Sequence, residues 1–114
     1  MARVVLLVDD DPMVLEVTAI LLEDLGCDVV TATNGDEALA LLADNPRIEV
    51  LITDINMPGM NGFELAEKSK QMRAQLKILA LSGRETDGHG IPMIRKPFLR
   101  QDLVRAMEQN TGLC

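Results

Sequence analysis

The sequence is poor in aromatic residues, with no tryptophan, no tyrosine and only two phenylalanines. Its core must therefore be aliphatic, and seven methionines are available to fill irregular gaps. No apolar run approaches the ~18 residues that a membrane-spanning helix needs, and no signal-peptide pattern precedes the first apolar segment. We therefore expect a soluble, cytoplasmic protein without a membrane partner.

Cysteine is equally scarce. Cys27 enters a predicted strand and Cys114 ends the sequence, and these two residues offer neither a disulfide framework nor the spacing of a metal site. This pattern fits the reducing conditions of the cytoplasm.

Positive charge is the third shortage. The sequence has 11 lysines and arginines against 18 aspartates and glutamates, so its net charge is -7 at pH 7. This balance disfavours nonspecific attraction to nucleic acid or anionic lipid, and we expect no nucleic-acid partner.

Apolar runs alternate with segments of helical periodicity, and turn residues separate them. The predicted strands cover residues 3–8, 27–31, 50–52, 77–81 and 91–95. The predicted helices cover residues 12–25, 36–43, 62–74 and 99–109. This alternation predicts an α/β fold with a parallel sheet and helices on both faces. With 114 residues, we expect one domain over residues 1–114.

The predicted helices have recognisable ends and faces. Asp11 precedes Pro12, so it is expected to cap the first helix and not to bind metal, and Gly26 ends that helix. The side chains expected to face the core are Val14, Val17, Thr18, Leu21 and Leu25 in the first helix, Phe63, Ala66 and Met72 in the third, and Leu99, Leu103, Ala106 and Met107 in the last.

The segment between the last two predicted strands has a different character. Residues 83–90 hold three glycines in eight positions and show no apolar periodicity, so they predict a loop instead of a helix. His89, the only histidine, lies between two of these glycines. It has no neighbouring ligand partners, and we expect it to be solvated.

Polar residues follow four of the predicted strands. Residues 9–11 are three consecutive aspartates, Asp54 ends the third strand, Ser82 follows the fourth and Lys96 follows the fifth. Parallel strands would bring these side chains to one edge, where open α/β sheets place their ligands. Clustered carboxylates raise each other's pKa unless a cation lies among them, and oxygen ligands of this kind suit Mg²⁺.

These residues form a set of motifs in a definite order. They are Asp9-Asp10, Asp54 with Asn56-Met57-Pro58 and Gly62, Ser82, and Lys96-Pro97-Phe98. With them the chain resembles the receiver domain of two-component response regulators over nearly all of its length. The resemblance implies a doubly wound, five-stranded parallel sheet of the flavodoxin type, with strand order 2-1-3-4-5.

The resemblance also implies a function in phosphorelay signalling. Asp54 would accept a phosphoryl group from a phosphohistidine on a histidine kinase or a histidine phosphotransfer protein, helped by Lys96 and Ser82. The protein would catalyse its own phosphorylation and dephosphorylation and would not act as an enzyme on a separate substrate. The Lys96-Pro97 peptide bond is expected to be cis, as in the family.

The same resemblance implies a magnesium site. Asp10 and Asp54 would be direct ligands, the backbone carbonyl of Asn56 would complete the protein's share, and Asp9 would act through water. Mg²⁺ usually keeps several waters, so this sparse ligand set suffices.

The sequence departs from the family pattern in two places. Residues 83–90 are too few for a complete fourth helix, and Met93 stands where many receivers have a Tyr or Phe that rotates on activation. We therefore expect the output signal to come from ordering of residues 83–92 on phosphorylation. The short segment resembles receivers attached to hybrid histidine kinases.

Two other functions stay open. The fold could serve as a docking module without phosphorylation, although Asp10, Asp54, Ser82 and Lys96 are all retained. A small Mg²⁺-dependent phosphohydrolase with an aspartyl-phosphate intermediate is the third possibility, but 114 residues hardly allow a substrate cap.

The first helix is expected to dock the phosphodonor. Met13 and Ile20 lie on a flank of this helix, seven positions apart, and packing of the core does not explain them. An exposed apolar pair beside a catalytic edge can mark a partner surface.

Overall fold

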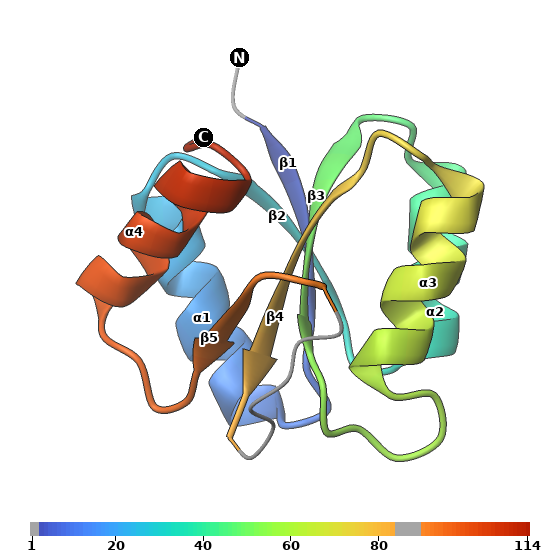
Figure 1. Ribbon diagram of the computed structural model, residues 1–114, viewed down its shortest axis with the longest axis horizontal. Coiled ribbons are helices and arrows are strands. Elements are labelled where there is room, and N and C mark those ends of the chain that lie inside the picture. Colours follow the sequence, from blue (N-terminus) through green and yellow to red (C-terminus); the bar gives the residue numbers. More distant parts are fainter. Residues whose placement is uncertain (1–2, 84–89) are drawn as a thin grey trace.

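In a computed structural model, described for residues 3–83 and 90–114, five parallel strands and four helices form an α/β sandwich (Figure 1). The strands are β1 (Val4–Val8), β2 (Asp28–Ala32), β3 (Ile48–Asp54), β4 (Lys77–Ser82) and β5 (Met93–Arg95). The helices are α1 (Pro12–Asp24), α2 (Gly35–Asp44), α3 (Gly62–Met72) and α4 (Arg100–Asn110). Every predicted element is present, with ends that differ by at most two residues.

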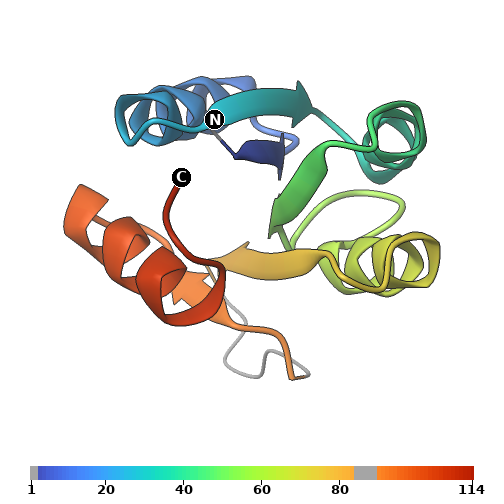
Figure 2. The same ribbon diagram turned by 90° about the horizontal axis from the view of Figure 1, so that it is seen from above.

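The sheet has the order β2-β1-β3-β4-β5, and each neighbouring pair is parallel, as predicted. Helices α1 and α4 cover one face, and α2 and α3 cover the other (Figure 2). Val5 and Leu7 pack under α1 and α4, whereas Leu6 and Val8 pack under α2 and α3. Successive residues of a strand point to opposite faces of the sheet. Because helices cover both faces, β1 is buried on both sides, and its sequence is a continuous apolar run.

Side chains at the helix ends satisfy backbone groups that the helices leave open. The Asp11 carboxylate accepts hydrogen bonds from the backbone N–H groups of Met13 and Val14, which confirms its predicted role as a cap. Asn34 and Asn61 cap α2 and α3 in the same way. None of the described helices has the length and apolar character that crossing a membrane would require.

The predicted inner face of α1 is correct at Thr18, which is buried, and at Leu21 and Leu25, which pack against the core, but it omits Leu15 and Leu22 and wrongly includes Val17. Leu15, Thr18 and Leu22 are buried, whereas Val17 is 55% exposed. Apolar residues surround most of this helix, so periodicity alone could not locate the side that faces the sheet. Met72 and Leu99, also expected to face the core, are exposed, and Phe63 is only half-buried.

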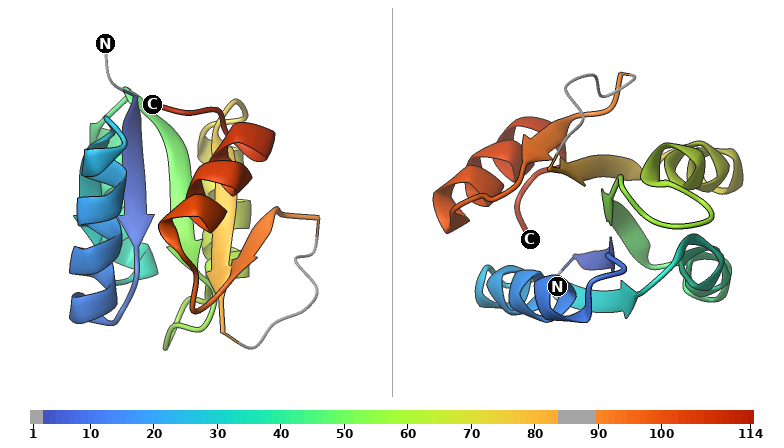
Figure 3. Two further views of the ribbon diagram at one scale, coloured as in Figure 1. Left: turned by 90° about the vertical axis from the view of Figure 1, so that its left-hand side faces the viewer. Right: turned by 90° about the horizontal axis from the view of Figure 1, so that it is seen from below.

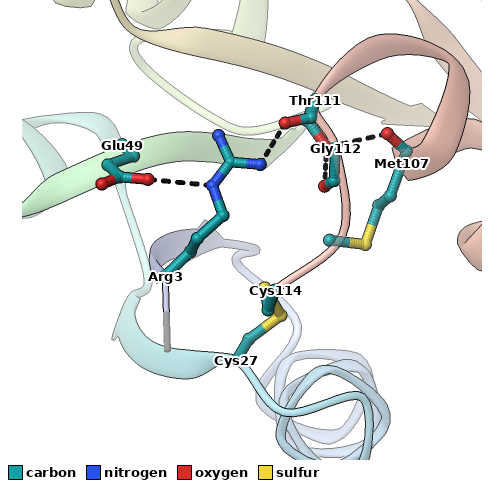
Figure 4. The surroundings of a disulfide bond; sticks show 7 residues. All are labelled: Arg3, Cys27, Glu49, Met107, Thr111, Gly112 and Cys114. Atoms are coloured by element: carbon teal, nitrogen blue, oxygen red, sulfur yellow. Dashed lines mark hydrogen bonds and ion pairs between the residues drawn. A yellow bond between two sulfur atoms is a disulfide. The ribbon is translucent and has the colours of Figure 1, made fainter. Parts of the chain in front are cut away.

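The expectation for the cysteines is also wrong, because Cys27 and Cys114 form a disulfide bond (Figure 4). Their Cα atoms lie 5.0 Å apart although 87 positions separate them in the sequence. Helix α4 lies on the same face of the sheet as α1, and the segment after α4 reaches the turn between α1 and β2. Spacing along the sequence gave no indication of this proximity.

No helix is found among the described residues between β4 and β5, which agrees with the predicted shortening of the fourth helix. Residues 84–89, including His89, lie outside the described part of the chain, so the expected loop, its ordering on phosphorylation and the solvation of His89 remain predictions.

Gly62 lets helix α3 begin directly against the end of β3. A Cβ atom at this position would lie 2.8 Å from the backbone Cα of Ile55 and would also clash with the backbone carbonyl of Asp54. The corresponding glycine of α2, Gly35, meets only the flexible side chain of Met60. The close packing at Gly62 therefore sets the position of the loop that follows Asp54.

We predict that Gly62→Ala lowers the free energy of unfolding by about 2 kcal/mol, because backbone atoms must move to make room. Gly35→Ala is the matched control, since both glycines are the first residue of a helix that follows a capping asparagine. It should cost less than about 1 kcal/mol because a methionine side chain can move aside. Urea unfolding of both variants measures the difference, and equal losses would contradict this account.

Candidate functional site

The carboxyl ends of β1 and β3 lie side by side and bring three aspartates together. Val8 pairs with Thr53 in the sheet, so Asp9 and Asp10 follow β1 beside the end of β3, where Asp54 lies. Carboxylate oxygens of Asp9, Asp10 and Asp54 all lie within 4.8 Å of one another. Asp9 and Asp54 are buried and Asp10 is exposed.

Lys96 reaches this cluster from the end of β5, the edge strand of the sheet. It follows β5 directly, and its backbone N–H donates to the carbonyl of Ser82 at 2.7 Å. Its ammonium lies 3.1 Å from a carboxylate oxygen of Asp9 and 3.1 Å from one of Asp54. The Lys96-Pro97 peptide bond is cis, which confirms that prediction.

The electrostatics of the cluster follow from its burial. Burial raises the pKa of Asp54 above its ordinary value, and the negative charge of Asp9 adds to this rise. The hydrogen bond and charge of Lys96 and the backbone N–H of Asn56 oppose the rise without cancelling it. For Lys96, burial lowers the pKa, but hydrogen bonds and charges from Asp9 and Asp54 outweigh burial, and the pKa is raised. Lys96 is thus held in its charged form.

Ser82 and Asn56 complete the edge of the site. Ser82 is fully buried at the end of β4, one position beyond Leu81, which pairs with Asp54. Asn56 follows Asp54 by two positions, and its backbone N–H hydrogen-bonds the Asp54 carboxylate. The structure therefore brings the six residues singled out in the sequence to the carboxyl edge of the sheet.

A groove beside the site was not foreseen from the sequence. It has a volume of about 480 Å³. Its lining residues are Met13, Val14, Val17, Thr18, Leu21, Lys96, Pro97 and Phe98. The sequence predicts that Val17 faces the core, but Val17 is exposed and joins Met13 in the lining of this groove.

This fold and this carboxylate and lysine cluster define the receiver class of signalling domains, and comparison with known proteins agrees. The family model of the response regulator receiver domain matches residues 5–108. The chain therefore belongs to the response regulator receiver domain family.

Individual relatives show the same likeness. The chain is 34% identical to the autoinducer 1 sensor kinase/phosphatase LuxN of Vibrio campbellii over 92 residues, which are 81% of this chain and 11% of LuxN. It is similar to the structure of the chemotaxis protein CheY4 of Vibrio cholerae, with 32% identity, a TM-score of 0.85 and coverage of 96% of this chain and 98% of that one. The receiver domain of the hybrid histidine kinase CckA gives 33% identity, a TM-score of 0.82 and coverage of 93% and 96%.

The curated relatives are longer proteins. The chain spans 11% of the length of LuxN and 46% of the length of a matched response regulator. The activities of those whole proteins are therefore not assigned to this chain.

We predict that Lys96→Met lowers the free energy of unfolding at pH 7 by about 3 kcal/mol, because two buried carboxylates lose their shared cation. Arg100→Met is the matched control. Arg100 pairs with Asp24 at 3.2 Å, but both side chains are more than half exposed, so its loss should cost under about 1 kcal/mol. Chemical denaturation measures both changes, and a loss at Lys96 as small as that at Arg100 would contradict the prediction.

Proposed function

We propose that this receiver domain accepts a phosphoryl group on Asp54 from a phosphohistidine, carried by a histidine kinase or a histidine phosphotransfer protein. The observation that carries the proposal is the Lys96 ammonium, which lies 3.1 Å from both Asp9 and Asp54 at the carboxyl edge of the sheet. A cytoplasmic location, expected from the sequence, is part of this proposal.

In the proposed reaction, a carboxylate oxygen of Asp54 attacks the phosphorus atom. The bond between phosphorus and the imidazole nitrogen breaks, the nitrogen keeps the electron pair, and an acyl phosphate forms on Asp54. Catalysis of this kind depends mostly on positioning and on neutralising charge. Lys96 would pair with a phosphoryl oxygen, and the Ser82 hydroxyl would donate a hydrogen bond to another.

In this proposal, hydrolysis of the acyl phosphate on Asp54 ends the signal. A water oxygen attacks phosphorus, the bond between phosphorus and the Asp54 oxygen breaks, and the carboxylate is restored with release of inorganic phosphate. The Lys96 ammonium and the Ser82 hydroxyl would stabilise charge on the phosphoryl group in both reactions. The domain would in this way catalyse its own phosphorylation and dephosphorylation.

The three carboxylates fit a magnesium site. They offer hard oxygen atoms within 4.8 Å of one another, and Lys96 balances only part of their charge. We propose Asp10, Asp54 and the backbone carbonyl of Asn56 as ligands, with Asp9 acting through water. When bound there, Mg²⁺ supplies neutralisation of the carboxylates and of the incoming phosphoryl oxygens.

The alternative functions have less support. A docking module without phosphorylation would not need two buried carboxylates beside a lysine, an arrangement that burial makes unfavourable. A phosphohydrolase acting on a small substrate would need an enclosing cap, and no such element covers the carboxylates in the described part of the chain.

We also propose that α1 docks the phosphodonor. Met13, Val17 and Ile20 form an exposed apolar ridge along α1, and they are 75%, 55% and 56% exposed. The ridge begins two residues after Asp11, next to the carboxylate cluster, and it borders the groove that includes Lys96. A helix of the donor protein with its own apolar face fits such a ridge.

We predict that Asp54 is the only phosphorylation site. Incubation with acetyl phosphate and Mg²⁺ should add the mass of one phosphoryl group to the wild type and none to Asp54→Asn, as read by intact mass spectrometry. Asp11→Asn is the matched control and should label fully, because asparagine also caps helices. Full labelling of Asp54→Asn would refute the assignment.

We predict that Mg²⁺ stabilises the fold through Asp10. At about ten times its dissociation constant a ligand adds about 1.4 kcal/mol, which raises the melting temperature of a small domain by about 5 °C. Asp10→Ala should abolish the rise. Asp28→Ala, at the opposite end of the strands, should keep it. An equal rise in wild type and Asp10→Ala would exclude Asp10 as a ligand.

We predict that Ile20→Asp slows phosphoryl transfer from a phosphohistidine protein by about tenfold, because a buried interface would then contain an unpaired charge. Labelling by acetyl phosphate should not change. Met72→Asp is the matched control, since Met72 is also exposed but lies on α3, across the sheet. Unchanged transfer to Ile20→Asp would show that the donor docks elsewhere.

A further inference from the structure

The disulfide bond between Cys27 and Cys114 has no part in the proposed phosphoryl chemistry. It lies at the edge of the sheet opposite the carboxylate cluster, where the segment after α4 passes the turn between α1 and β2 (Figure 3). Cys27 is 5% exposed in the core under α1 and α4. Cys114 is half-buried and follows the exposed Leu113.

Contacts other than the disulfide bring the two cysteines together. Arg3 pairs with Glu49 at 2.8 Å, and its guanidinium donates to the backbone carbonyl of Thr111. The backbone N–H of Gly112 donates to the carbonyl of Met107. Gly112 has a φ of +81°, and the chain turns there toward Cys27. These bonds hold residues 111–112 in place without the sulfur atoms, so the reduced thiols would stay near each other (Figure 4).

We propose that Cys27 and Cys114 are a reversible redox site, and that their oxidation clamps the end of α4 to the end of α1. The proposal rests first on the proximity of the cysteines in a segment that is independently anchored. It rests second on the unequal burial of the two residues, since Cys27 is buried and Cys114 is half-buried.

In the proposed reaction the reductant attacks the less buried residue first. A thiolate of a dithiol reductant attacks the sulfur of Cys114, the bond between the two protein sulfurs breaks, and Cys27 leaves as a thiolate that takes up a proton. The second thiol of the reductant then attacks the mixed disulfide, which releases Cys114 and leaves the reductant as a disulfide. Oxidation by a disulfide reagent runs through the same steps in reverse.

The proposed location fits this reversible behaviour. Disulfides of cytosolic proteins are usually transient, and many are catalytic or redox-sensing. If the domain acts in the cytoplasm, as proposed, a stable structural role for this bond would be the less common case.

The clamp acts on the two helices that flank the proposed donor surface. Helix α1 carries the apolar ridge, and the groove beside it is completed by residues 96–98, which lead into α4. Asp24 and Arg100 already join the two helices through an exposed ion pair. The groove is present in the disulfide-bonded form, and a covalent bond between the ends of α1 and α4 would restrict the relative motion of these helices. Such preorganisation lowers the entropic cost of docking. This last step rests on the proposed function.

The redox site is tested first without phosphorylation. Folded protein is equilibrated in mixtures of oxidised and reduced dithiothreitol, quenched with acid, alkylated and weighed by intact mass spectrometry. We expect one reversible transition between a form without adducts and a form alkylated at both cysteines. Alkylation of both cysteines throughout the range, or a bond that resists reduction in the folded protein, would overturn the proposal.

The clamp is tested by thermal unfolding. Closing a loop of this length should make the oxidised wild type melt roughly 8–15 °C higher than the reduced form. Cys114→Ser changes a half-buried position, so it should fold and should melt at the same temperature with and without reductant. A wild type with equal melting temperatures in both forms would show that the bond clamps nothing.

Control of donor docking is tested on the same two forms. Reduction should raise the apparent KM for a phosphohistidine protein by about twofold to fivefold and leave labelling by acetyl phosphate unchanged. No change in KM would overturn the regulatory step. Absence of labelling by both donors would instead count against the proposed function, and the redox titration would still judge the cysteine pair.

Discussion

The constraint on which the site depends is the contact of one lysine with two buried carboxylates. Lys96 follows the edge strand β5, whereas Asp9 follows β1 and Asp54 is the last residue of β3. Its ammonium reaches these carboxylates because the backbone N–H of Lys96 is hydrogen-bonded to Ser82 and because only one strand, β4, lies between β5 and β3. A shift in the register of β4 against β3, or of β5 against β4, would leave two buried negative charges without their cation. Such unpaired buried charges are strongly destabilising.

Much of this arrangement could be predicted, because it depends on strand ends. Asp9, Asp54, Ser82 and Lys96 each follow an apolar run, and parallel strands necessarily bring such positions to one edge. The inner face of α1 could be predicted only in part, since apolar residues surround most of that helix and the sheet decides which of them are buried. Pairing of Cys27 with Cys114 depends on how α4 packs beside α1, and this information is not in their spacing.

Helix α1 connects the chemistry to the opposite edge of the domain. Its first turn is capped by Asp11, whose own backbone N–H donates to the Asp9 carboxylate at 2.9 Å. Its exposed ridge begins at Met13, and Cys27 lies three residues beyond its last residue. One rigid element thus spans the distance from the carboxylate cluster to the disulfide. A change at either end therefore acts on an element that also borders the groove.

The attachment of α4 explains why the opposite edge needs extra contacts. This helix follows β5, a strand of only three residues that pairs on one side with β4. So short an edge strand supplies few backbone hydrogen bonds, and α4 must be held by its own contacts. Leu103 and Met107 bury its inner face, Arg100 joins its first turn to α1, and Arg3 holds the carbonyl of Thr111. The disulfide between Cys27 and Cys114 is a further attachment, and unlike the others it can be broken by a thiol reagent. Reduction would therefore remove one restraint on α4 and leave its packing and polar contacts in place.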